Sequence, residues 1–194
     1  MENKAKKAIV FIDGGNFYFK LKEMSQKLGK RYSLLDFRFK DFCKWLVGEN
    51  KFVEIRYYLG AIRRENNNEK SEIMYANQQK LFRKLQSQNI VVVLGQLIKH
   101  PDKTYHEKGV DVRLAVEMIR FARENKYDTA YLISSDTDLV PAVEEVKTFG
   151  KEVLYVGFPS NQSFGLTKTS DSLLLLRKDD LMNFFPPTTQ KLGI

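Results

Sequence analysis

The chain has 194 residues, of which 43% are hydrophobic and 29% charged, a balance typical of one globular domain and not of a disordered or collagen-like chain. Its 32 Lys and Arg residues outnumber 24 Asp and Glu residues, and the resulting net charge of +8 attracts polyanions. The single cysteine, Cys43, excludes an internal disulfide and a zinc site of the Cys-x-x-Cys type.

Short strand-like runs alternate with longer helical patterns along the chain. We expect strands over residues 8–12, 52–59, 90–94, 130–133, 152–156 and 173–176, and helices over residues 16–28, 40–47, 71–87, 111–124 and 139–148. Residues 99–109 are expected to form a polar loop. The alternation predicts an α/β protein with three layers, in which helices cover both faces of a central, mainly parallel sheet.

Residues 1–185 are expected to form one domain, and residues 186–194, which begin with two prolines, a flexible tail. No apolar run approaches the roughly 20 residues that a membrane-spanning helix needs. The basic segment over residues 1–7 precedes an apolar run of only residues 8–12, which is too short for a secretory signal. We therefore expect a cytoplasmic protein with no membrane partner.

Polar side chains follow the first and the fourth expected strands, where each strand ends. Parallel sheets bind ligands beyond the carboxyl ends of their strands, and these two strands are expected to be neighbours. Their ends would then bring together Asp13, Asn16, Asp136 and Asp138. Asp111 begins the helix before the fourth strand, in line with its apolar stripe, so we expect this side chain to face the sheet.

Each of these acids also has an ordinary structural explanation. Asp13 suits a strand-to-helix turn, and Asp111 and Asp138 suit helix N-caps. As a group, however, the carboxylates would repel, by roughly 4 kcal/mol for two charges about 4 Å apart at an effective dielectric near 20. Hard oxygen ligands without His or Cys select Mg²⁺ or Mn²⁺. The cluster therefore favours metal-assisted hydrolysis of a phosphodiester bond.

Three segments resemble the motifs of NYN domains, which are LabA-like relatives of the PIN-domain ribonucleases: residues 11–16 (FIDGGN), 108–112 (KGVDV) and 134–139 (SSDTDL). The resemblance extends over residues 7–185, and the three motifs occur in the family's order and spacing. It implies a PIN-like, Rossmann-like fold and a Mg²⁺- or Mn²⁺-dependent ribonuclease. It also implies that the metal-site acids are Asp13, Asp111, Asp136 and Asp138, with Asn16 as their polar neighbour.

Basic residues in the two polar segments suggest a phosphate-binding rim. Arg63 and Arg64 follow the second expected strand, and the third is followed by Lys99, Lys103, Tyr105 and Lys108. We expect the cations to contact phosphates and Tyr105 to stack on a base of single-stranded RNA, with Ser134 and Ser135 completing the substrate-binding set. A solvated loop is the alternative interpretation for the basic segment.

Other functions stay open at this point. The same acids could belong to an RNA-binding or protein-interaction module that cleaves nothing, or to a nuclease that prefers DNA. A homo-oligomer is also open. Nucleotide-binding folds fit poorly, because the sequence lacks both G-x-x-x-x-G-K-[ST] and the G-x-G-x-x-G spacing.

Overall fold

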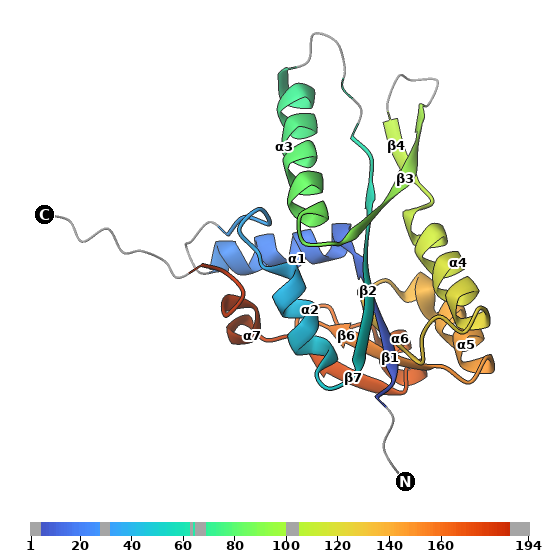
Figure 1. Cartoon of the computed structure of the whole chain (residues 1–194). Helices are drawn as coiled ribbons and strands as arrows, with labels where there is room; N and C mark the ends of the chain where they lie inside the picture. Colours follow the sequence, from blue (N-terminus) through green and yellow to red (C-terminus); the bar gives the residue numbers. More distant parts are fainter. Residues whose placement is uncertain (1–4, 28–31, 63, 65–68, 100–104, 187–194) are drawn as a thin grey trace, which may run out of the picture.

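A seven-stranded sheet forms the centre of the computed structural model, which describes residues 5–27, 32–62, 64, 69–99 and 105–186. Within these ranges, the parallel strands lie in the order β3-β2-β1-β5-β6-β7, and β4 pairs antiparallel with the outer edge of β3 (Figure 1). Their bounds are β1 Lys7–Asp13, β2 Lys51–Gly60, β3 Val91–Lys99, β4 Tyr105–Lys108, β5 Thr129–Ile133, β6 Glu152–Gly157 and β7 Ser172–Leu175. The expected mainly parallel sheet is confirmed.

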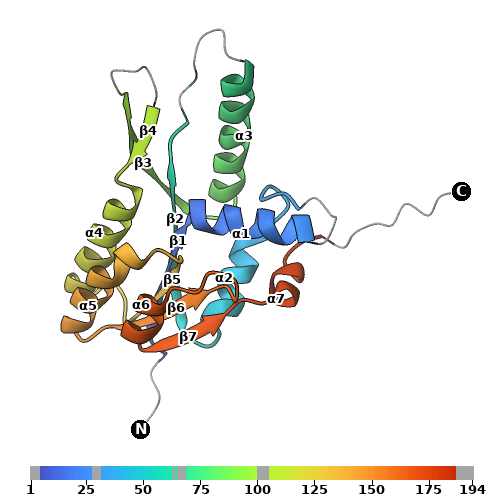
Figure 2. The ribbon, with the colours of Figure 1, turned by 180° about the vertical axis from the view of Figure 1, so that it is seen from behind.

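Helices cover both faces of this sheet (Figures 1 and 2). One layer contains α1 (Gly14–Lys27), α2 (Phe39–Val47), α3 (Glu69–Gln86) and α7 (Lys178–Met182). The other contains α4 (Val110–Arg123), the 3₁₀ turn η1 (Thr137–Leu139), α5 (Val140–Thr148) and α6 (Phe164–Thr169). This is the expected three-layer α/β/α architecture. No helix of the described residues is long and apolar enough to cross a membrane.

The strand β1 shows why its sequence is apolar without alternation. Val10 and Ile12 point into the core beneath α1 and α2, whereas Ile9 and Phe11 point into the core beneath α4 and α5. Successive side chains of a strand point to opposite faces of the sheet. Because helices cover both faces here, the side chains on both sides of β1 are buried and have to be apolar. The central position of β1 places its carboxyl end, and Asp13, in the middle of one edge of the sheet.

The polar loop expected over residues 99–109 is wrong in part. β3 continues to Lys99, and β4 returns antiparallel, with Lys99 opposite Tyr105 and Gln96 opposite Lys108. Backbone hydrogen bonds, which any side chain permits, form this hairpin, so hydrophobic periodicity did not indicate it. The short helices α6 and α7 were not expected either. Residues 187–194 of the expected tail lie outside the described residues.

Candidate active site

The carboxyl ends of β1 and β5 meet through a hydrogen bond between two side chains. The strands pair in parallel with Ile12 opposite Ile133, which puts the following residues, Asp13 and Ser134, side by side. The Ser134 hydroxyl donates to Oδ2 of Asp13 at 2.8 Å, and both residues are buried. A buried carboxylate needs such a donor, because losing hydration without compensation is costly.

Asp13 also shapes the turn from β1 into α1. Its Oδ1 accepts a hydrogen bond from the backbone N–H of Asn16 at 3.0 Å, so the ordinary turn role coexists with any role in catalysis. Gly14 is required by close approach: a Cβ there would lie 2.2 Å from Cε1 of Tyr57 and 2.6 Å from the carbonyl oxygen of Tyr58. The Tyr57 hydroxyl donates to the Gly14 carbonyl at 3.2 Å. Glycine at position 14 is therefore a packing requirement of this strand end.

The segment after β5 continues the same hydrogen-bond chain. The backbone N–H of Asp136 donates to Oγ of Ser134 at 3.1 Å, so Ser134 contacts both acidic residues. Oδ1 of Asp136 accepts from the Asp138 N–H at 2.9 Å, which makes Asp136 the N-cap of η1. The alternative explanation of Asp138 as a helix N-cap therefore does not hold, because Asp136 has that role. The Ser135 hydroxyl donates to Oδ1 of Asn16, so these side chains also join the two strand ends.

Asp111 lies in the first turn of α4, two residues after Gly109. Gly109 is the N-cap of this helix and has a φ of +85°. The side chain of Asp111 is exposed, so the expectation that it faces the sheet is wrong. The buried stripe of α4 begins at Val110 and continues at Leu114, so Asp111 lies beside it.

The pKa of Asp111 is raised, first by partial loss of hydration and then by the negative charges of Asp13, Asp136 and Asp138. The charges of three acids from two other segments therefore act on Asp111.

The donor atoms at these strand ends are carboxylate, amide and hydroxyl oxygens, the chemistry that Mg²⁺ and Mn²⁺ select. A cation would also relieve the repulsion that raises the pKa of Asp111. In the described part of the chain, however, no three His, Cys, Asp or Glu side chains form a group ready to hold a metal ion. Both oxygens of Asp13 are directed to protein donors, namely Ser134 and the backbone of Asn16. The donor set fits a hard cation, and closer approach of the carboxylates would be needed to hold it.

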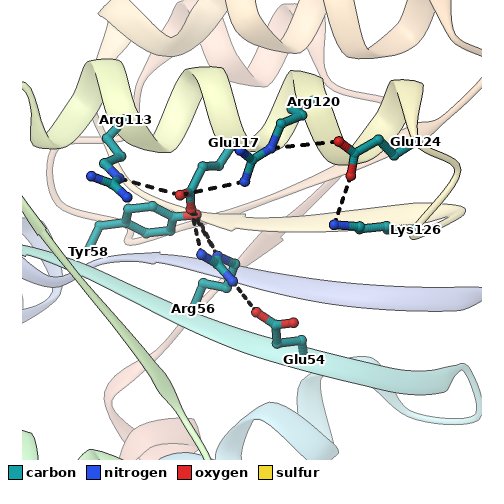
Figure 3. Close-up of polar contacts among 8 residues, drawn as sticks. All are labelled: Glu54, Arg56, Tyr58, Arg113, Glu117, Arg120, Glu124 and Lys126. Carbon is teal, nitrogen blue, oxygen red and sulfur yellow. Dashed lines mark hydrogen bonds and ion pairs between the residues drawn. The ribbon is translucent and has the colours of Figure 1, made fainter.

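A buried ion pair fastens α4, the helix that carries Asp111, to the sheet (Figure 3). Glu117 is 5% exposed, and its Oε2 accepts from Nη2 of Arg56 at 2.7 Å and from the Tyr58 hydroxyl at 2.9 Å. Burial by itself would raise the pKa of Glu117, but the hydrogen bonds from Tyr58 and Arg56 outweigh it and lower that pKa. Tyr58 lies opposite Asp13 in the pairing of β1 with β2, so this network lies beside the acid cluster.

Glu117 was not predicted from the sequence, although its spacing from the apolar residues of α4 indicates a buried position. It lies three residues after Leu114 and four before Phe121, on the apolar stripe of α4. A carboxylate in that stripe requires a cationic partner on the sheet, because an unpaired charge is rarely buried.

The expected phosphate-binding rim is only partly described. Arg64 is exposed and pairs with Glu72 of α3, with its Nη2 2.9 Å from Oε1. Lys99, Tyr105 and Lys108 belong to the β3–β4 hairpin, and Arg63 and Lys103 lie outside the described residues. The hairpin and α3 both extend beyond the main body of the sheet (Figure 1). No described contact joins this rim directly to the acids, although α4 and Asp111 follow β4 immediately.

The three-layer fold, with acidic residues at the carboxyl ends of its central strands, is that of a PIN-like protein. The NYN domain model matches residues 7–176, and the chain therefore belongs to the NYN domain family, as its motifs indicated. This membership indicates a nuclease of the PIN-like kind. The family's members generally depend on divalent metals and bind RNA.

Comparison with solved structures supports the fold. The chain is similar to the crystal structure of a protein of unknown function from Vibrio parahaemolyticus, with a TM-score of 0.67 and 21% sequence identity. The likeness covers 92% of this chain and 98% of that chain. At that identity it bears on the fold alone. No curated protein matches the sequence.

Proposed function

We propose that this protein is a Mg²⁺- or Mn²⁺-dependent ribonuclease that hydrolyses phosphodiester bonds in single-stranded RNA. The observation that carries the proposal is the junction of the two strand ends, where the Ser134 hydroxyl donates to Asp13 and accepts from the backbone N–H of Asp136. Partial loss of hydration and the negative charges of Asp13, Asp136 and Asp138 raise the pKa of Asp111, which supports the same grouping. Acids at the strand ends of a PIN-like fold are suited to a divalent cation, which would lower the pKa of a bound water and stabilise charge on a phosphoryl oxygen.

The proposed roles follow from the contacts at the strand ends. The four acids would hold the cation, and Ser134 would orient two of them, since it donates to Asp13 and accepts from the backbone of Asp136. Asn16, held by the Ser135 hydroxyl, lies beside the same strand ends and would contact substrate. Hydrogen bonds from Ser134 and Ser135 position Asp13 and Asn16 before substrate binds, and the carboxylates would move closer to one another as the cation binds.

Charge distribution supports a polyanionic substrate. Without the four acids, 24 − 4 = 20 acidic residues remain, so the rest of the chain carries 32 − 20 = +12. A strongly positive scaffold would attract the phosphate backbone, while the local negative cluster would hold the cation. Arg63, Arg64 and the hairpin residues Lys99, Lys103, Tyr105 and Lys108 remain the proposed phosphate and base contacts. The strands β2 and β3 lie parallel to β1, and both continue past the position of Asp13 at its carboxyl end.

The proposal is tested by incubating the purified protein with labelled single-stranded RNA and Mn²⁺ or Mg²⁺, with and without a chelator. We expect chelator-sensitive cleavage, and its loss in Asp136→Asn with an unchanged circular dichroism spectrum. The matched control is Asp179→Asn, an exposed aspartate in α7, which should cleave normally. Full activity in Asp136→Asn would overturn the assignment of the acids.

The second candidate is an RNA-binding module that does not cleave. One observation favours it: among the residues that the structure describes, no three acidic, His or Cys side chains form a group ready to hold a metal. Binding of RNA without chelator-sensitive cleavage would establish this alternative. The same assay with a DNA strand of equal sequence would reveal a nuclease that prefers DNA.

A further inference from the structure

The phenylalanine at the start of α6 projects into solvent more than any other large hydrophobic side chain of the described residues. Phe164 is 80% exposed, compared with 66% for Phe19, the next most exposed aromatic residue. Isolated exposed hydrophobic residues are common on protein surfaces, so exposure alone assigns nothing. The position of Phe164 relative to the acids is what makes it informative.

Ser163 connects the start of α6 to the acidic segment after β5. Its hydroxyl lies 3.2 Å from Oγ1 of Thr137, the residue between Asp136 and Asp138. The backbone N–H of Ser163 donates to the Tyr155 hydroxyl at 3.1 Å, a second contact that holds Ser163 in place. Phe164 is the next residue along the chain, so its backbone lies beside the segment that carries Asp136 and Asp138.

Gly165 shows how closely α6 packs on that segment. A Cβ at this position would lie 2.9 Å from Cγ2 of Val140 and 3.0 Å from Cγ2 of Thr137. The following residue, Leu166, is fully buried in the core, and its N–H donates to the Ser163 hydroxyl at 3.2 Å. The backbone of Phe164 is therefore held on both sides, and only its side chain extends outward.

A cation accompanies the ring. Lys168 is exposed and lies four residues after Phe164 in α6, which puts the two side chains on the same face of the helix. An exposed aromatic ring next to a cation is the combination that binds single-stranded nucleic acid: the ring stacks on a base and the cation attracts the phosphate backbone. Because its backbone is already fixed, such a ring loses little conformational freedom on binding.

We propose that Phe164 is a stacking residue for an unpaired base close to the phosphate that the acids cleave, with Lys168 contacting a neighbouring phosphate. This inference rests on the proposed ribonuclease function. A paired base within a duplex is already stacked on both sides, so the ring would bind only a base that is free. Stacking on Phe164 would therefore make the site selective for single-stranded RNA over duplex RNA.

The test measures binding separately from cleavage. Fluorescence anisotropy with a labelled single-stranded oligoribonucleotide, in the presence of chelator, gives Kd for the unmodified chain, Phe164→Ala and the control Phe19→Ala. We expect Phe164→Ala to weaken binding roughly 5- to 100-fold, the range that stacking on one base produces, and Phe19→Ala to bind normally. Duplex RNA should bind Phe164→Ala and the unmodified protein equally. If Phe164→Ala and the unmodified protein bind the single strand with equal affinity, the proposal is overturned.

A spectroscopic variant tests stacking directly. In a Trp45→Phe background, which removes the only native tryptophan, the emission of Phe164→Trp should be quenched when the single strand binds, and its affinity should match that of the unmodified chain. Unchanged emission at saturation would contradict stacking. A change in the sedimentation coefficient of Phe164→Ala with unchanged affinity would instead show a contact between copies and overturn the proposal.

The stacking role of Phe164 and the proposed ribonuclease function can be tested separately. Tight binding that depends on Phe164, without cleavage in Mn²⁺, would overturn the nuclease and leave the stacking residue in place. Normal binding and cleavage by Phe164→Ala would overturn the stacking residue and leave the nuclease in place. If the unmodified protein binds no single-stranded RNA, the inference is wrong.

Discussion

The hydroxyl of Ser134 donates to Oδ2 of Asp13 at 2.8 Å and so joins the carboxyl ends of β1 and β5. The same oxygen accepts the backbone N–H of Asp136 at 3.1 Å. One buried serine thus positions acids from two segments that are more than a hundred residues apart in sequence. Its importance can be tested without changing any carboxylate.

The substitution Ser134→Ala should destabilise the protein and slow cleavage. It removes the donor to a buried carboxylate, and leaving such a group unsatisfied costs about 1–3 kcal/mol. Urea denaturation measures the free energy of unfolding, and the cleavage assay measures the rate. Ser172→Ala, at an exposed serine of β7, is the control and should change neither. Equal losses in both variants would show that Ser134 has no special role.

The substitution Asp111→Asn should stabilise the protein at neutral pH in chelator. The pKa of Asp111 is raised in the folded state by partial loss of hydration and by three neighbouring carboxylates, so its ionised form opposes folding. Its favourable contribution is complete below the unfolded pKa and is lost as pH rises through the folded pKa. The gain in Tm from Asp111→Asn should therefore be seen at pH 7 and disappear below the ordinary aspartate pKa. A lower Tm than the unmodified protein at pH 7 would contradict this repulsion.

Divalent cations should raise the Tm of the unmodified protein. A ligand that binds only the folded state stabilises it, by about 2.7 kcal/mol at a concentration of 100 Kd. The shift produced by Mn²⁺ should be much smaller in Asp136→Asn, because one of the proposed ligands is lost. Asp179→Asn should keep the full shift, since that exposed residue is on α7. An identical shift in all three proteins would indicate that the cation binds elsewhere.

The substitution Glu117→Gln should destabilise the protein by about 1.5–3 kcal/mol, the range for hydrogen bonds to charged groups, since it removes the more buried of the two carboxylates that pair with Arg56, the other being that of Glu54. The pKa of Glu117 is lowered on folding, so its stabilising contribution is present above the unfolded pKa and is lost as pH falls through the folded pKa. Urea denaturation at several pH values should show a steeper acid-side decline in the unmodified protein than in the variant.

The exposed glutamate directly after the same helix provides the control for Glu117. Glu124 pairs with Lys126 at 2.8 Å on the surface, where water screens the charges, so Glu124→Gln should have a much smaller effect. If both variants lose the same stability, the buried network of Figure 3 does not hold α4 on the sheet.

The central strands could be predicted from sequence because their burial leaves a local signature. The apolar run over residues 8–12 became β1, since a strand covered on both faces has to be apolar throughout. The hairpin β3–β4 left no such signature, because backbone groups form it and most of the residues that carry them are polar. Helix α6 contains only six residues, which is too short for a helical pattern to be recognised.

The α/β alternation, the three family motifs and the acids at two strand ends can be recognised in the amino-acid sequence, because each depends on residues that are close together in the chain. The folded chain was needed to show that Ser134 bridges Asp13 and Asp136, that the exposed Asp111 is affected by three charges from other segments, and that Phe164 follows a serine in contact with the acidic segment. Strand order and helix packing bring these groups together from segments far apart in the chain. Hydrophobic periodicity in the sequence indicates on which face of its helix or strand a side chain lies. The packing of helices and strands against one another decides which residues that side chain contacts.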